Sequence, residues 1–223
     1  MEPGPLRDLM TAVVIELITT GSELMLGRVL NSHQQWICRQ LADAGYSVQR
    51  QVAVPDTAPA IQQAVAEALT RADWVITTGG LGPTSDDLTR EWIAQLLGRP
   101  LREDRVILAE LAAFFARRNR PMPPRTALQA LVPEGAAVLP NPNGTAPGLF
   151  IALEPNPFRS DQRPAWLVML PGPPRELRPM FADQVLPRLK GLCPLPVSCA
   201  CRTLRTVGIG ESQVEQLIAE PLR

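Results

Sequence analysis

A glycine-rich stretch between a short apolar run and an amphipathic segment constrains this chain more than any other feature. The apolar run Trp74–Ile76 predicts a buried strand, and apolar residues recur at helical spacing from Leu88 until Gly98. The stretch between them, Thr77 to Glu91, reads TTGGLGPTSDDLTRE. A strand, a glycine-rich turn and a helix start leave backbone N–H groups and the positive end of a helix dipole facing one point. The stretch therefore predicts a site for a phosphate or another anion.

Two carboxylates, Asp86 and Asp87, stand in the same turn. Carboxylates repel a phosphate unless a cation such as Mg²⁺ lies between them, so the turn predicts a metal-assisted phosphate site with both as metal ligands. The alternative is a tight turn whose glycines only shape the backbone and whose Asp86 only caps a helix. The stretch lacks the Gly-Lys-Ser/Thr ending of a P-loop, and Ser85 replaces the third glycine of a dinucleotide fingerprint.

The length of 223 residues suits one ordinary domain with a smaller appendage. The 22 basic and 22 acidic residues balance, so no global charge recruits nucleic acid or an anionic membrane. Four cysteines and one histidine group too few ligands for a structural zinc site, which favours reduced thiols. Without a signal-peptide pattern or an apolar run of membrane-spanning length, we expect a cytoplasmic protein.

Strand-like runs alternate with helical patterns along most of the chain. Strands are expected over residues 13–18, 48–54, 74–76, 149–153 and 166–170. Helices are expected from residue 32, over 61–69, after 87, over 106–118, in a short piece over 126–131, and after 173. This alternation predicts an α/β sandwich with a mostly parallel sheet.

Several local features carry expectations of their own. Glu16 interrupts the first strand, and a buried carboxylate needs a partner, so we expect one. Ser32 with Gln35 matches a capping box, and Pro179 predicts a kink or a second helix start. The segment 106–118 is amphipathic, with expected inward side chains at Leu108, Leu111, Phe114 and Phe115.

Three expected strands end in glycine turns, at residues 21–23, 79–87 and 171–173. Ligands of open α/β sheets gather at the carboxyl ends of the strands. The convergence of three such turns favours a ligand site over turn chemistry alone.

The same residues resemble a known family. Gly21-Ser22-Glu23-Leu24, the run 77–84 with Asp87, Asn141-Pro142 and the run 170–174 are similar to the molybdopterin-binding-like domain, in the variant found in the N-terminal half of the competence/damage-inducible protein A (CinA) family. The resemblance covers Val13 to Leu189. It implies a three-layer α/β/α sandwich and a homo-oligomer, either a dimer or a trimer.

The resemblance also divides the chain. Residues 1–11 are expected to be a disordered tail and residues 12–192 the molybdopterin-binding-like domain. Residues 193–223 would begin a small α/β connecting subdomain, with a strand over 197–207 and a helix from Ser212, that the sequence does not complete. The amidohydrolase-type domain of full-length members is absent from this sequence.

Residue roles carried over from the family fall on the turns already described. The catalytic acids would be Asp87, Asp56 and Glu23, and the metal ligands Asp86 and Asp87. The phosphate-binding set would be Gly21, Ser22, Thr78, Gly79, Gly80, Gly82, Thr84, Asn143, Gly144, Thr145, Pro171, Gly172, Pro173 and Arg175. Simpler interpretations remain open: Asp56 and Glu23 as helix caps, and Arg175–Glu176 as a solvated pair.

The resemblance implies three possible functions. The first is a pyrophosphatase that uses Mg²⁺, Mn²⁺ or Co²⁺ to hydrolyse ADP-ribose or a similar nucleotide. The second is a protein that binds and adenylylates molybdopterin in cofactor synthesis. The third is a catalytically silent nucleotide-binding module of a nicotinamide-nucleotide amidohydrolase. In each case the partner is a small nucleotide or pterin, not nucleic acid or a membrane.

Overall fold

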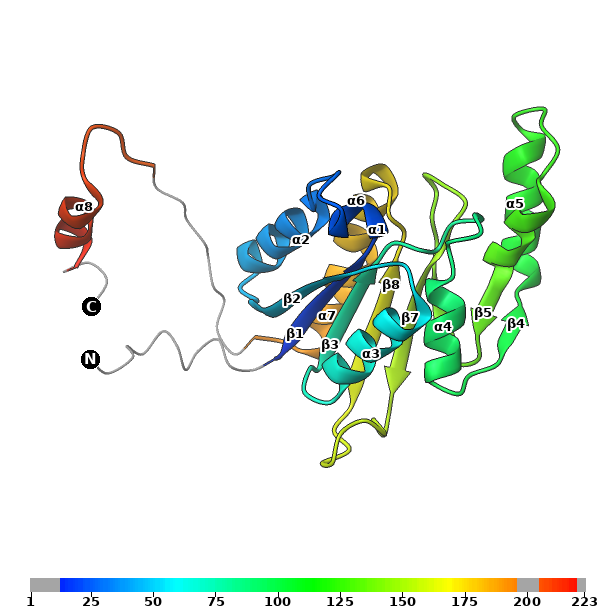
Figure 1. Ribbon diagram of the computed structural model, residues 1–223, viewed down its shortest axis with the longest axis horizontal. Coiled ribbons are helices and arrows are strands. Elements are labelled where there is room, and N and C mark those ends of the chain that lie inside the picture. Colours follow the sequence, from blue (N-terminus) through cyan, green and yellow to red (C-terminus); the bar gives the residue numbers. More distant parts are fainter. Residues whose placement is uncertain (1–12, 196–204, 220–223) are drawn as a thin grey trace.

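A six-stranded sheet forms the centre of the computed structural model, which describes residues 13–195 and 205–219 (Figure 1). The strand order is β2-β1-β3-β8-β7-β6, and β2, β1, β3 and β8 are parallel while β7 runs antiparallel to both of its neighbours. The expected mostly parallel sheet is confirmed. The strands are β1 Ile15–Thr20, β2 Val48–Val54, β3 Trp74–Thr78, β6 Ala136–Leu139, β7 Gly148–Leu153 and β8 Ala165–Leu170.

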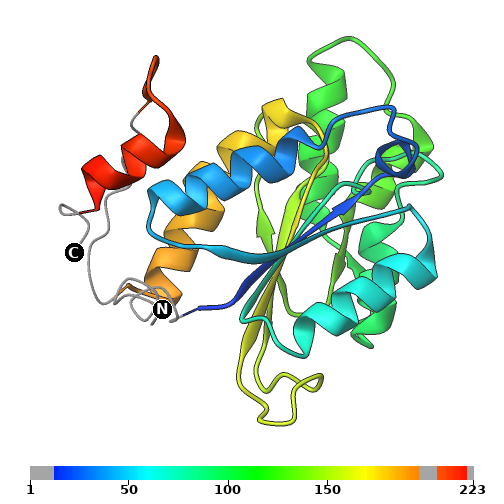
Figure 2. The same cartoon turned by 60° about the vertical axis from the view of Figure 1, so that its left-hand side comes forward.

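Helices cover both faces of the sheet, which confirms the three-layer sandwich (Figures 1 and 2). One face packs against α2 Ser32–Asp43, α6 Pro174–Met180 and α7 Leu186–Leu192, and their buried apolar side chains meet those of β1 and β3. The other face packs against α3 Ala58–Leu69 and α4 Thr89–Leu96 in a second apolar core. The continuous apolar runs of the strands reflect burial on both sides.

A smaller lobe stands beside the edge of the sheet, at the right of Figure 1. It contains the antiparallel pair β4 Leu101–Glu103 and β5 Leu131–Pro133, the helix α5 Arg105–Ala116 and the 3₁₀ helix η1 Pro124–Ala130. Asp104 caps α5, because its carboxylate accepts the N–H groups of Val106 and Ile107 at 2.8 and 3.1 Å. Ile107 and Leu111 are the buried side chains of α5, and Leu108 packs, partly buried, against the same core, as expected. The expectation was wrong for Phe114 and Phe115, which are half-buried and lie outside that core.

Two helix boundaries differ from the sequence patterns. Asn31, not Ser32, caps α2, since its side chain accepts the N–H of Gln34 at 3.2 Å. The single turn α1 Ser22–Met25 was not expected.

The interruption predicted at Pro179 is present: α6 ends at Met180 and continues as one π-helical turn, η2 Phe181–Val185, before α7. Proline has no N–H and its ring disturbs the preceding turn, which explains the wider turn.

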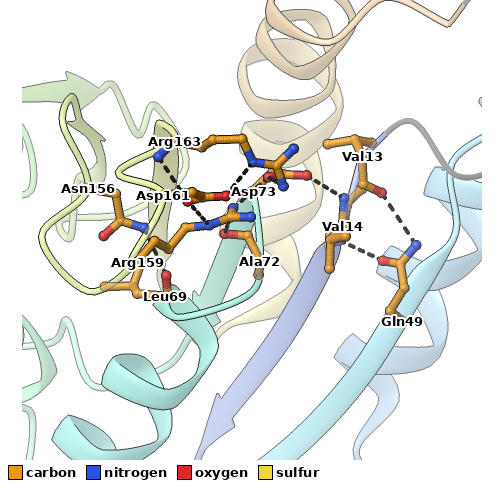
Figure 3. A network of polar contacts seen from close by, with 11 residues as sticks. Val13, Val14, Gln49, Leu69, Ala72, Asp73, Asn156, Arg159, Asp161 and Arg163 are labelled. Carbon is orange, nitrogen blue, oxygen red and sulfur yellow. Dashed lines mark hydrogen bonds and ion pairs between the residues drawn. The ribbon is translucent and has the colours of Figure 1, made fainter.

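The partner expected for Glu16 is Arg71, whose Nε and Nη2 lie 2.5 and 2.9 Å from the two carboxylate oxygens. A second buried charge, on Arg159, joins the β7–β8 loop to the start of β3 (Figure 3). Its Nη1 lies 2.7 Å from Asp73 Oδ1, while Asp73 Oδ2 accepts the Val14 N–H at 2.9 Å. This network fixes the amino-terminal edge of the sheet.

The C-terminal segment is described only in part. The strand expected over 197–207 lies mostly outside the described residues, as does the tail expected over 1–11, and residues 205–207 form no strand. The helix expected from Ser212 is α8 Glu211–Ile218. Within the described ranges, none of the helices combines the length and the apolar character needed to cross a membrane.

Candidate functional site

The loops that follow four neighbouring strands meet at one edge of the sheet. Because β2, β1, β3 and β8 are parallel neighbours, their carboxyl ends lie together, followed by the loops at residues 55–57, 21, 79–88 and 171–173. Two backbone hydrogen bonds join these loops: the Gly21 N–H donates to the Val54 carbonyl and the Gly79 N–H to the Leu170 carbonyl, both at 3.0 Å. The structure thus brings the three predicted glycine turns together.

The turn after β3 can be built only from glycine at its first two positions. Gly79 and Gly80 have φ angles of 103° and 66°, in the left-handed region that side chains disfavour. A Cβ on Gly80 would overlap the Thr89 hydroxyl, and one on Gly79 would lie 2.6 Å from Thr20 Oγ1. A Cβ on Gly82 would overlap the Asp87 carboxylate. At these three glycines the backbone is therefore packed so closely against its neighbours that a side chain has no room.

Several polar groups at this turn have no partner within the described part of the chain. The N–H groups of Gly80, Leu81 and Gly82 reach no protein acceptor, and the buried hydroxyls of Thr78 and Thr89 make no hydrogen bond. Polar groups without partners are rare in the interior of folded proteins. Such donors at a strand end, next to the start of α4, suit the oxygens of a phosphate.

The two carboxylates of the turn are organised by Thr84. Its hydroxyl contacts Asp86 Oδ1 at 2.5 Å and also Asp87 Oδ2, which accepts the Thr84 N–H at 3.0 Å. Two hydrogen bonds to the Asp86 carboxylate hold its pKa below the usual value. The larger effect comes from the Thr84 hydroxyl and the smaller one from the backbone N–H of Asp86 itself. Asp86 is not a helix cap, because α4 begins at Thr89 and its N-cap position, Leu88, carries no side-chain hydrogen bond.

The other predicted acids lie at the ends of β1 and β2. Asp56 Oδ2 accepts the Ser22 N–H at 2.8 Å, and Ser22 Oγ accepts the Asp56 N–H at 3.2 Å. Glu23 folds back over Gly21, where an added Cβ would lie 2.6 Å from Glu23 Oε1. Over residues 13–195 and 205–219, no three carboxylate, histidine or cysteine side chains form a group that could hold a metal ion.

The loop between β6 and β7 and the start of α6 form the remaining wall. Asn141 donates through Nδ2 to Glu176 Oε2 at 2.7 Å, and its Oδ1 accepts the Asn143 N–H at 3.1 Å. Gly144 approaches Glu176 so closely that a Cβ would overlap its carboxylate. Glu176 is buried, so the interpretation of Arg175–Glu176 as a solvated pair was wrong for the glutamate, while the Arg175 side chain is 79% exposed.

Sequence analysis did not identify the side chains of Gln129 and Arg125, which donate hydrogen bonds to backbone carbonyls of the turn. Gln129 donates to the Leu81 carbonyl at 3.2 Å, and Arg125 donates to the carbonyls of Pro83 and Thr84 at 3.1 and 3.2 Å. Both side chains come from η1, more than 40 residues further along the chain. No local pattern connects η1 with the turn, so only the fold reveals them.

Comparison with known proteins places this geometry in a family. Residues 16–191 match the family described as "Probable molybdopterin binding domain". The structure of the protein CinA from Thermoplasma acidophilum is similar with a TM-score of 0.68 and 31% identity, over 79% of this chain and 98% of that one. The chain belongs to this domain family, in its CinA branch. A competence-damage inducible relative of Symbiobacterium thermophilum is 48% identical over 201 residues, covering 90% of this chain and 45% of the relative.

Other CinA-branch relatives show the same pattern of coverage. A CinA-like protein of Akkermansia muciniphila is 42% identical over 94% of this chain and 48% of its own length, so the chain spans about half the length of the curated relatives it matches. The molybdopterin biosynthesis enzyme MoaB of Thermus thermophilus has the same fold, with a TM-score of 0.52 and 23% identity. The CinA-type domain predicted from the sequence is confirmed.

Proposed function

We propose that this CinA-type domain is a metal-dependent pyrophosphatase that hydrolyses ADP-ribose or a similar nucleotide. The observation that carries the proposal is the turn after β3, where the unpaired N–H groups of Gly80, Leu81 and Gly82 stand beside the carboxylates of Asp86 and Asp87. Donors for phosphate oxygens and ligands for a cation are two of the features that metal-dependent cleavage of a pyrophosphate uses.

A divalent ion at the turn would be bound by the free carboxylate oxygens of Asp86 and Asp87. Asp87 Oδ2 is engaged by Thr84, which leaves one oxygen on each of Asp86 and Asp87. Two carboxylates suit Mg²⁺ or Mn²⁺, which complete their coordination with substrate phosphate and water. An ion held there would neutralise phosphate charge and lower the pKa of a bound water.

The protein's own groups would orient the substrate. The three glycine-turn amides and the Thr78 hydroxyl would hold non-bridging oxygens and stabilise the charge that grows on them in the transition state. The loop at Asn143–Thr145 and the turn at Pro171–Pro173, with Arg175, would close the opposite side. Attack by water on one phosphorus then breaks the P–O–P bond of ADP-ribose, giving AMP and ribose 5-phosphate.

The test is incubation of the purified chain with ADP-ribose and Mg²⁺, Mn²⁺ or Co²⁺, following AMP release. Asp87→Asn keeps an acceptor for the Thr84 N–H but removes the charge, so we expect turnover to fall at least about 100-fold while the unfolding midpoint stays close to wild type. Asp43→Asn, which removes an exposed acid at the end of α2, serves as the control. Absence of turnover with all three metals contradicts the proposal.

The family description, a probable molybdopterin binding domain, favours a second candidate, the binding of molybdopterin. Adenylylation of the bound pterin is the activity that the sequence resemblance adds to this candidate. The same phosphate cradle would then hold the terminal phosphate of the pterin. Binding of a phosphorylated pterin without release of AMP from ADP-ribose would favour this candidate, and binding of either ligand without chemistry would favour a silent module.

We also propose that the chain assembles as a homo-oligomer. Four large apolar side chains are exposed together on α1 and the segment after it, next to the loops of the site: Met25, Leu26, Val29 and Leu30, with exposed fractions of 48%, 64%, 53% and 90%. Several exposed apolar side chains within one short segment are typical of a protein contact.

A further inference from the structure

A groove of about 690 Å³ lies between α5 and the loop 140–147, apart from the glycine turn. One wall is the face of α5 that carries Glu110, Ala113, Phe114 and Arg117, which are spaced three or four residues apart. The apolar floor consists of Ile107, Leu111, Val138 and Pro147. This size and this mixture of an apolar floor with a few polar groups are typical of sites for small organic ligands.

Both walls of the groove are joined to the candidate site. The loop 140–147 reaches it through the hydrogen bond from Asn141 to Glu176 on α6. On the other side, the Asp104 N–H donates to the Ala130 carbonyl at 2.8 Å, so the start of α5 is joined to the end of η1. Since Arg125 of η1 also donates to the carbonyls of Pro83 and Thr84, η1 connects the groove with the glycine turn.

The chemistry of the groove suits a flat heterocycle. Phe114 lines it, and the guanidinium of Arg118 lies over that ring at 3.5 Å from its centroid, a cation–π contact. Glu110 and Arg117 are exposed and Thr145 is half-exposed, so their polar atoms are available to ring nitrogens and exocyclic groups. An aromatic side chain with a few hydrogen-bonding groups around it is typical of sites for planar ligands.

We propose that this groove binds the planar nitrogen heterocycle of the substrate, adenine or pterin, while the phosphates lie at the glycine turn. The second half of this statement rests on the proposed function; the first does not depend on hydrolysis. The groove would determine which nucleotide or pterin binds, because the glycine turn would contact only the phosphate groups, which such ligands share.

The test fills the groove without changing a residue of the glycine turn. Ala113→Trp places a large side chain in the groove from an exposed position of α5, so the fold should tolerate it. Ala112→Trp makes the same change one residue earlier, at an exposed position that does not line the groove. Both variants and the wild type are titrated by calorimetry, with Mg²⁺ present, with AMP, neopterin and inorganic pyrophosphate.

We expect Ala113→Trp to weaken AMP or neopterin binding at least about tenfold while pyrophosphate affinity stays within about twofold, and Ala112→Trp to change neither. Whether AMP or neopterin responds identifies the heterocycle. Equal heterocycle affinity in all three proteins, or no binding of AMP or neopterin to the wild type, overturns the proposal. Heterocycle binding that Ala113→Trp weakens supports it even where ADP-ribose is not hydrolysed, so its outcome is separate from that of the pyrophosphatase.

Discussion

Ser22 and Asp56 exchange two hydrogen bonds, from the Ser22 N–H to Asp56 Oδ2 and from the Asp56 N–H to Ser22 Oγ. Through this pair the loop after β2 fixes the start of α1 after β1. Asp56 was predicted to be a catalytic acid from the family resemblance, and the pair gives it a structural role that needs an acceptor but no charge.

The two roles of Asp56 can be separated by substitution. Asp56→Asn keeps an oxygen acceptor, so we expect stability near that of the wild type, whereas Asp56→Ala should lose about 1 kcal/mol of unfolding free energy. Urea unfolding followed by tryptophan fluorescence measures both. If Asp56 is also a catalytic acid, Asp56→Asn will stop ADP-ribose turnover in a protein of normal stability; unchanged turnover would leave it only the structural role.

Gly80→Ala should damage the turn more than its backbone angle alone explains. Gly80 and Gly98 have similar φ angles of 66° and 62°, but nothing lies within 4 Å of a Cβ added at Gly98, while one at Gly80 overlaps Thr89. We expect Gly98→Ala to cost about 1–2 kcal/mol and Gly80→Ala about 1–3 kcal/mol more. Urea unfolding gives the difference, and equal losses would mean that Thr89 moves aside without penalty.

The Glu16–Arg71 pair should contribute measurably to stability because its carboxylate is buried. The side chain of Glu16 is 4% exposed and that of Arg71 is 38% exposed. Arg71→Met leaves the carboxylate without its charged donors, so we expect a loss of about 2 kcal/mol. Arg71→Lys keeps the charge without the two-pronged geometry and should lose less. Stability unchanged in Arg71→Met would show that water replaces the guanidinium.

His33 should make the domain less stable in mild acid. Burial, and then the charge of Arg178, hold its pKa below the usual value, so the folded state favours the neutral imidazole. Its contribution is fully present above the unfolded pKa of about 6.5 and is lost as the pH falls through the lower folded pKa. His33→Gln should therefore lose less stability than the wild type between pH 7 and pH 5 in urea titrations. Parallel pH profiles for the two proteins would contradict this.

The exposed apolar segment 25–30 should be required for self-association. Leu30→Glu places a charge on its most exposed member and should shift the mass measured by light scattering toward that of a monomer. Leu217→Glu changes another exposed leucine, on α8, and should not. A wild-type protein that is monomeric at high concentration would rule out the proposed homo-oligomer.

Much of the fold could be predicted because its determinants are local. The apolar runs at β1, β3 and β8 identify strands buried on both faces, and the glycines after them mark one edge of a parallel sheet. Where two signals were adjacent, the pattern was ambiguous: Asn31 and Ser32 are both good helix caps, and the structure uses Asn31.

The contacts that shape the site join distant residues, so sequence reasoning could not supply them. A partner for Glu16 was expected, but Arg71 is 55 residues away, and Asn141 and Glu176 are 35 residues apart. On α5 the half-burial of Phe114 and Phe115 depends on how little of that helix the small lobe covers. Burial, not pattern, decides which face of such a helix is internal.

The hydrogen bonds from η1 to the glycine turn determine which way the peptide groups of the turn point. In a planar trans peptide the carbonyl and the following N–H point opposite ways. The carbonyls of Leu81, Pro83 and Thr84 are held toward η1 by Gln129 and Arg125, so the N–H groups of Gly82, Thr84 and Ser85 point away from it. The orientation of these peptide groups is thus set from outside the site, so the proposed binding of phosphate can be altered through residues that would not touch it.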